Sequence, residues 1–243
     1  MGAEQIAIVT LGALAGGFVA GFAGFGTGLT ALGLWLYVLD PATAGTLVII
    51  CSVAAQAQTI PLVWRHIEPR RVLPFIVPGL FGVPLGVLLL GLLDARALKI
   101  GVGAIVLASS LHMLVRVSRR IHWGGRAADA AIGFGGGILG GFAGLSGPLP
   151  TMWATLRGWA KHESRSVFQA YNLTILVAAL VAHAVAGLLT PAVGWATLAA
   201  LPGTALGGFI GGRAYARLSD QRFRQVILGL LCVSGLSLIA TNL

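Results

Sequence analysis

Long apolar segments separated by short polar turns run through the whole chain. Five of them cover residues 42–64, 72–93, 98–115, 172–189 and 226–243, and charged residues are almost absent from their interiors. Each is close to the 17–25 apolar residues that an α-helix needs to cross a bilayer. The pattern therefore predicts an all-α polytopic membrane protein.

Composition and charge support this fold class. Hydrophobic residues make up 57% of the chain and charged residues only 9%, whereas a soluble domain carries about 25% charged residues. The net charge of +9 comes from Lys and Arg that lie between the apolar segments, where the positive-inside rule places them. We therefore expect the lipid bilayer as a partner and no nucleic acid.

A glycine-rich sequence occurs twice. "GFAGFGTG" occupies residues 21–28 and "GFAGLSGP" residues 141–148, so a shift of 120 positions superposes them. With a few inserted residues, Pro78-Gly79 then matches Pro202-Gly203. Such internal similarity indicates a duplicated unit. We predict two membrane repeats, residues 1–120 and 121–243, which together form one transmembrane domain.

The basic residues test the orientation of the two repeats. If all eight apolar segments crossed the bilayer, the sixteen Lys and Arg would divide seven to nine. If each glycine-rich segment instead enters and returns on one side, as a re-entrant helix pair, fourteen lie on one side and only Arg96 and Lys99 on the other. The second division satisfies the positive-inside rule. It leaves three transmembrane helices per repeat and inverts the second repeat, with basic loops in the cytoplasm of a bacterial cell, the protein in its inner membrane and both termini in the periplasm.

The glycines themselves allow two interpretations. Inverted repeats with interrupted helices recur in secondary transporters, and the polar Thr27 and Ser146, together with Pro148 and Pro150, favour a helix break in each glycine-rich segment. Glycines spaced four apart also let two helices approach closely. The pairs that fit this packing role are Gly17/Gly21, Gly24/Gly28 and Gly137/Gly141.

The sequence resembles the TauE/SafE family of sulfite and organosulfonate exporters. The resemblance lies in "GFAGFGTGLTALGL", in "GFAGLSGPLPTMWATLRGW" with the following "RSVFQAYNL", and in the Pro-Gly-rich segment of each half. It covers essentially the whole chain and implies transport of a small anion. This chain departs from the family pattern at Thr27, where many relatives have glycine, and at Ser146 and Pro148, which make the second segment stiffer.

A helix that begins at the bilayer midplane directs unpaired N–H groups and a partial positive charge into the protein interior. Such a terminus suits an oxyanion without a metal or a fixed cation, and we expect no metal and no cofactor. Each glycine-rich segment would supply one terminus. The expected substrate-binding residues are Gly26, Thr27, Gly28, Ser52, Gln56, Ser146, Gly147, Thr151, Gln169 and Asn172.

The polar residues of the neighbouring spans have an alternative role. Ser52 and Asn172 occupy corresponding positions in the two halves, and Gln56 and Gln169 lie one helical turn from them on the same helix face. Amide side chains in a membrane also simply join helices through hydrogen bonds. The sequence alone leaves both roles open for Gln56, Gln169 and Asn172.

Few ionisable groups are available for coupling. His183 is the most interior of them, and it is a candidate either for proton coupling or for a structural hydrogen bond. Arg165 is expected at the cytoplasmic mouth, either to attract anions or simply as a charge that sets topology. Trp153 could form a wall of the site, whereas Trp159 is expected to anchor the membrane interface and His112 to lie near it.

These observations favour a secondary transporter that exports a small organosulfonate or sulfite-type anion, sulfoacetate among the candidates. The alternatives are import, or a channel, for another small anion such as thiosulfate or a short carboxylate. An enzyme is not expected, because no nucleophile–base pair and no ligand spacing for a metal is evident. A homodimer is a further expectation common among such transporters.

Overall fold

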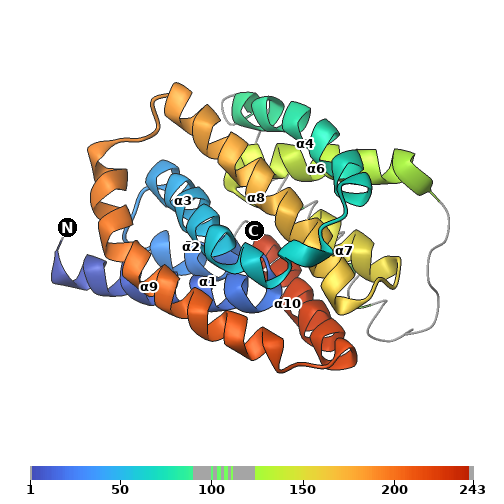
Figure 1. Ribbon diagram of the computed structural model, residues 1–243. Coiled ribbons are helices and arrows are strands. Elements are labelled where there is room, and N and C mark those ends of the chain that lie inside the picture. Colours follow the sequence, from blue (N-terminus) through green and yellow to red (C-terminus); the bar gives the residue numbers. More distant parts are fainter. Residues whose placement is uncertain are drawn as a thin grey trace.

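The computed structural model describes residues 2–89, 100, 103–104, 107–108, 111 and 124–240. These residues form helices joined by short turns (Figure 1). In the first half the helices are α1 (Ala3–Ala23), α2 (Thr27–Trp35), α3 (Pro41–Thr59), the 3-10 helices η1 (Ile60–Leu62) and η2 (Trp64–His66), and α4 (Pro69–Leu89). In the second half they are α6 (Gly125–Ala143), α7 (Pro148–Leu156), α8 (Lys161–Val185), α9 (Pro191–Ala216) and α10 (Asp220–Ala240).

Five of the described helices are long and apolar enough to cross a membrane. They span Ala3–Ala23, Ala42–Leu62, Pro69–Leu89, His162–Val185 and Pro191–Ala216. The predicted all-α membrane fold is therefore confirmed. The predicted segment 98–115 lies largely outside the described residues, as do Arg96, Lys99 and His112, so the charge count that orients the repeats stays a prediction.

Two helices are much shorter than the others. α2 and α7 have nine residues each, which corresponds to about 14 Å of helix and to half of the roughly 30 Å hydrocarbon core. α2 packs back along α1, and α7 packs back along α6. Each glycine-rich segment thus forms a hairpin with one long and one short arm.

Local sequence explains where several helices begin. Asp40 precedes Pro41, and its side chain accepts a hydrogen bond from the Thr43 backbone N–H at 3.0 Å. Thr190 precedes Pro191 and accepts one from the Val193 N–H at 3.4 Å. An N-cap acceptor followed by proline is a strong helix start, because proline has no N–H to leave unpaired.

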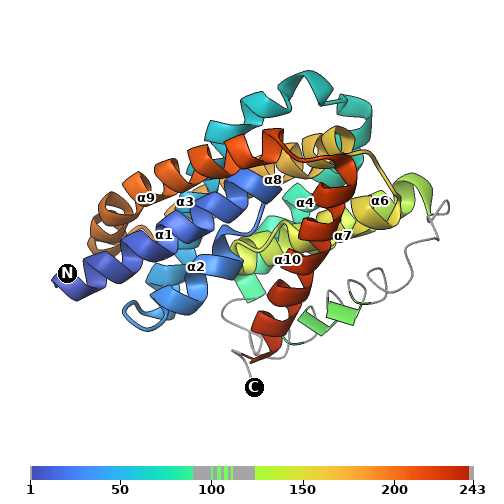
Figure 2. The ribbon, with the colours of Figure 1, turned by 90° about the horizontal axis from the view of Figure 1, so that it is seen from below.

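Two helix pairs pack with their backbones in close contact. α1 lies against α9, and α4 lies against α6; Figure 2 shows α1 and α9 side by side along their length. A methyl group on Gly17 would lie 2.5 Å from the Thr204 carbonyl oxygen, and one on Gly137 would collide with the carbonyl of Gly79. Close packing is therefore confirmed for the Gly17/Gly21 and Gly137/Gly141 pairs.

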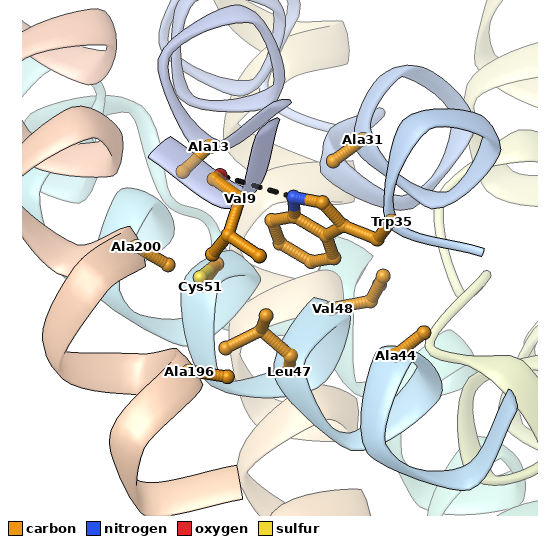
Figure 3. Close-up of a cluster of buried hydrophobic side chains, with 10 residues drawn as sticks. All are labelled: Val9, Ala13, Ala31, Trp35, Ala44, Leu47, Val48, Cys51, Ala196 and Ala200. Carbon is orange, nitrogen blue, oxygen red and sulfur yellow. Dashed lines mark hydrogen bonds between the residues drawn. The ribbon is translucent and has the colours of Figure 1, made fainter. Parts of the chain in front are cut away.

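A buried apolar cluster fixes the short helix α2 in place. The Trp35 ring, at the end of α2, packs among side chains of α1, α3 and α9 (Figure 3). Its indole N–H donates to the Val9 carbonyl oxygen at 3.0 Å. The ring fits here because residue 12 is glycine, since a Cβ at that position would lie 2.5 Å from the indole nitrogen. The end of α2 is thereby held at a defined position against α1, α3 and α9.

Candidate functional site

Both glycine-rich segments are true helix breaks. α1 ends at Ala23, and Gly24 and Gly26 have φ angles of 83° and 103° before α2 begins at Thr27. α6 ends at Ala143, and Gly144 has a φ angle of 66° before α7. Residues with a side chain rarely adopt these angles, so glycine is needed here for the turn itself. The helix-break interpretation is confirmed at these positions.

The two breaks meet at one cavity. Residues 25–29 line it from the first break and residues 144–148 from the second. Ser52 and Gln56 of α3 and Asn172 and Leu176 of α8 complete the lining. The structure thus brings together most of the predicted substrate-binding residues, namely Gly26, Thr27, Gly28, Ser52, Gln56, Ser146, Gly147 and Asn172.

Two predicted residues lie outside this lining. Thr151 is fully buried one turn into α7, and its hydroxyl has no hydrogen-bond partner within the described residues. Gln169 is also fully buried. Its amide nitrogen donates to the Thr59 hydroxyl at 2.8 Å, and its amide oxygen accepts from Arg165 Nε at 3.0 Å. Gln169 therefore holds Arg165 and Thr59 in place and does not form part of the cavity wall.

Asn172 connects the two breaks. Its amide nitrogen donates to the Gly24 carbonyl oxygen at 3.3 Å, and its amide oxygen accepts from the Ser146 hydroxyl at 3.0 Å. The amide nitrogen of Gln56 donates to the same Gly24 oxygen at 2.7 Å. Both side chains thus join helices and also line the cavity, so the two roles considered from the sequence coexist in the structure.

The cavity contains polar atoms that the protein leaves unpaired. The Thr27 hydroxyl and the Gln56 amide oxygen are buried without a hydrogen-bond partner within the described residues, and the two side chains are 1% and 2% exposed. Intrahelical bonding in α2 starts with the Thr30 N–H, which donates to Gly26. The N–H groups of the first turn of α2 therefore remain available, as at any helix start.

The start of α7 offers fewer donors. Its first intrahelical bond runs from the Thr151 N–H to the Gly147 carbonyl at 3.1 Å. Pro148 and Pro150 have no N–H, so Leu149 is the one residue of this first turn with a backbone donor. The two helix starts are thus chemically unequal although both belong to the cavity.

The cavity is narrow in this conformation. It has room for roughly one water molecule. An oxyanion with a sulfur centre and three oxygens is larger, so binding requires the two breaks to separate slightly. Apolar side chains such as Phe25, Leu29 and Leu176 lie among the polar ones and keep the remaining space small.

Arg165 is not the exposed charge that a purely topological role predicts, because its side chain is fully buried. Its place at the cytoplasmic mouth stays a prediction. Its two terminal nitrogens donate to the carbonyl oxygens of Gly21 at 2.6 Å and Phe22 at 3.1 Å, and its guanidinium lies 3.7 Å from the centre of the Tyr215 ring. The spacing of Arg165, Gln169 and Asn172 on one helix face was the signal that could have located it.

His183 does not line the cavity. Its Nδ1 lies 3.1 Å from the Thr46 hydroxyl, and its Nε2 lies 3.2 Å from the Gly141 carbonyl oxygen. The structure therefore places it in a structural hydrogen-bond pair at the end of α6, as one of the two sequence interpretations proposed. Its role in proton coupling stays a prediction.

The tryptophans near the second break lie away from the cavity. The Trp153 N–H donates to Asp129 at 2.7 Å, and Arg157 donates to the same carboxylate oxygen at 3.2 Å. The suggestion that Trp153 forms a wall of the site is wrong, because this hydrogen bond directs the ring toward α6. Trp159 is half-buried with its ring edge-on to Phe75.

Comparison with known proteins identifies the family. The family described as sulfite exporter TauE/SafE matches residues 8–238. The chain belongs to this family. A probable sulfite/organosulfonate exporter TauE of Cupriavidus necator is 28% identical over 232 residues, which cover 93% of this chain and 90% of the relative. No solved structure matches. Together with the apolar helices, family membership makes this a membrane transport protein.

Proposed function

We propose that the protein is a secondary transporter that exports a small organosulfonate or sulfite-type anion across the bacterial inner membrane. The TauE/SafE membership and the name of the Cupriavidus necator relative support an exporter of this class. The substrate is held between the two helix breaks. Backbone N–H groups at the start of α2 and the Thr27 hydroxyl donate to its oxygens, and the Ser146 hydroxyl joins them when it leaves Asn172 Oδ1.

Helix pairing supports an inverted-repeat mechanism for this transport. By the 120-residue correspondence, α1 matches α6 and the Pro-Gly helix α4 matches α9. α1 packs on α9 and α4 packs on α6, so the first helix of each half contacts the Pro-Gly helix of the other half. Such reciprocal contacts are expected if residues 1–120 and 121–243 form two inverted repeats that move against each other around a shared central site.

The observation that carries the proposal is the group of unpaired polar atoms in the cavity. Leaving a buried hydroxyl or amide oxygen without a partner costs about 1–3 kcal/mol each. The Thr27 hydroxyl and the Gln56 oxygen both bear this cost at the point where two helix breaks meet. The oxygen of a bound anion would accept from the Thr27 hydroxyl, and a ligand that also carries a proton would donate to the Gln56 oxygen.

Thermal unfolding of the purified protein in detergent tests the proposal. We expect stabilisation by sulfite or by an organosulfonate, for which sulfoacetate and taurine are tested, and weaker effects of thiosulfate and acetate. In proteoliposomes, the flux of the stabilising anion should saturate and should be stimulated by the same anion on the opposite side. Absence of stabilisation by every oxyanion would contradict the proposal, and a large unsaturable conductance would favour the channel alternative.

Variants at the bridge between the breaks locate the site. Ser146→Ala and Asn172→Ala should each weaken binding of the stabilising anion about tenfold, because both side chains line the cavity. Thr174→Ala provides a matched control, since its hydroxyl bonds to the Ala170 carbonyl of its own helix at 2.9 Å. Unchanged transport by both cavity variants would place the substrate elsewhere.

A further inference from the structure

A helix break exposes two opposite partial charges. The helix that ends carries about −0.5 elementary charge at its carbonyl end, and the helix that begins carries about +0.5 at its N–H end. In the first break these termini, at Ala23 and Thr27, are separated by only three residues. Because these opposite partial charges nearly cancel, a cation beside the end of α1 would make the break more attractive to an anion than the start of α2 is by itself.

Arg165 supplies a charge at this place. It donates to the Gly21 and Phe22 carbonyls, which belong to the last turn of α1. A methyl group built on Gly24 would lie 3.5 Å from Arg165 Nε, so the guanidinium borders the break itself. The negative terminus of α1 is thereby bound to a full cation, while the positive terminus of α2 remains directed at the cavity.

No acidic side chain neutralises this cation among the described residues. Their ion pairs involve Arg71 and Arg157 but not Arg165. The contrast with Arg157 is direct, because Arg157 pairs with Asp129 at 3.2 Å. The groups around Arg165 are carbonyls, the Gln169 amide and the face of the Tyr215 ring. A fully buried guanidinium with neutral partners gives its surroundings one net positive charge.

We propose that Arg165 is the positioning residue that sets the net charge of the site, and that the site consequently accepts a singly charged oxyanion. This inference rests on the proposed anion transport. Arg165 acts through the first break and does not itself line the cavity. The unpaired amide oxygen of Gln56 can in addition accept the proton of a monoanion such as hydrogensulfite.

Gln169 allows the charge to be neutralised without removing the arginine. Its amide oxygen already accepts from Arg165 Nε at 3.0 Å, so Gln169→Glu keeps this hydrogen bond and places a carboxylate beside the cation. Arg165→Gln removes the charge, and Arg165→Lys retains the charge but loses the planar arrangement of donors. Arg213→Gln is the control, since Arg213 is exposed and also lies over an aromatic ring, 3.9 Å from the centre of Phe209.

The probe is methanesulfonate, a monoanion, and binding is measured by titration of the purified full-length protein. Gln169→Glu and Arg165→Gln should weaken binding at least tenfold, whereas Arg165→Lys should stay within threefold of wild type and Arg213→Gln should be unchanged. The dianion ethane-1,2-disulfonate should bind the wild-type protein more weakly than methanesulfonate does.

Two results would overturn the inference. One is wild-type affinity of Gln169→Glu for methanesulfonate, and the other is an affinity of Arg165→Lys as weak as that of a folded Arg165→Gln. If Arg165→Gln does not fold, the inference is tested by the other two variants: it requires weakened binding by Gln169→Glu and nearly unchanged binding by Arg165→Lys. Failure of the wild-type protein to bind any oxyanion would instead overturn the proposed function, so the two failures are distinguishable.

Discussion

The two helix breaks have nearly the same sequence but different surroundings. At the first break, the carbonyls at the end of α1 receive hydrogen bonds from Arg165, Gln56 and Asn172. At the second, the Gly141 carbonyl at the end of α6 is within hydrogen-bond distance of His183. The Arg165 cation thus borders the first break, and the His183 imidazole borders the second.

The helix starts differ in the same direction. α2 begins with residues that all keep their backbone N–H groups, whereas α7 begins with Pro148 and has Pro150 two residues later. Proline at the first helical position restricts the chain and removes a donor. We therefore expect the first break to supply most of the attraction for the proposed anion and the second to form a rigid wall.

The largest expected effect is a loss of stability when the close glycine packing that both halves share is disrupted. Gly17→Val and Gly137→Val should each destabilise the protein by about 3 kcal/mol or more, because the added side chain collides with a backbone carbonyl of the partner helix. Thermal unfolding in detergent measures this. Gly45→Ala is the control, since nothing lies within 4 Å of a Cβ there. Tolerance of valine in only one half would show that the halves pack differently.

A smaller effect separates two buried threonines, one in each short helix. Thr27 and Thr151 both have unpaired hydroxyls, but only Thr27 lines the cavity. Replacing each by valine preserves the branched shape and removes the hydroxyl. Thr27→Val should weaken binding of the transported anion about fivefold, for a lost hydrogen bond of about 1 kcal/mol, whereas Thr151→Val should leave it unchanged. Equal losses in the titration would contradict the assignment of the cavity.

Sequence reasoning located the helix breaks and much of the cavity for an identifiable reason. The repeated glycine phrase aligned Ser52 with Asn172, and the helical period then added Gln56. The same reasoning failed for Arg165, because counting basic residues treats each as a loop charge and cannot show that one caps the carbonyls of another helix. It also missed the Trp153–Asp129 hydrogen bond, which joins residues of two helices with no sequence pattern between them.

Restoring a backbone N–H donor at the second break should change anion binding and stability only modestly. Pro148→Ala returns a backbone N–H to the first turn of α7, next to the cavity. Anion binding should tighten about twofold, while stability should fall by about 0.4–1 kcal/mol because the unfolded chain gains freedom. Titration and thermal unfolding of the same sample check both. Weaker binding would show that rigidity of α7 matters more than its donors.

The last effect lies outside the site, at the start of α3, and concerns stability alone. Hydrogen bonds from Thr43 hold the pKa of Asp40 below its ordinary value of 3.8. The stabilisation by ionised Asp40 is therefore complete above that value and disappears as the pH falls through the lowered pKa. Asp40→Ala should cost about 1 kcal/mol at neutral pH and progressively less in acid, whereas the loss from Thr190→Ala should not vary with pH. A constant difference between wild type and Asp40→Ala would contradict the capping role.

The central claim is that an oxyanion binds between the two helix breaks. Equilibrium binding of radiolabelled sulfite to the purified wild-type protein and to the Thr27→Val/Asn172→Ala double variant tests it most directly, with thermal unfolding to verify that both are folded. The account predicts saturable binding to one site in the wild type and a loss of at least tenfold in affinity in the double variant. Equal binding by the two folded proteins would contradict it.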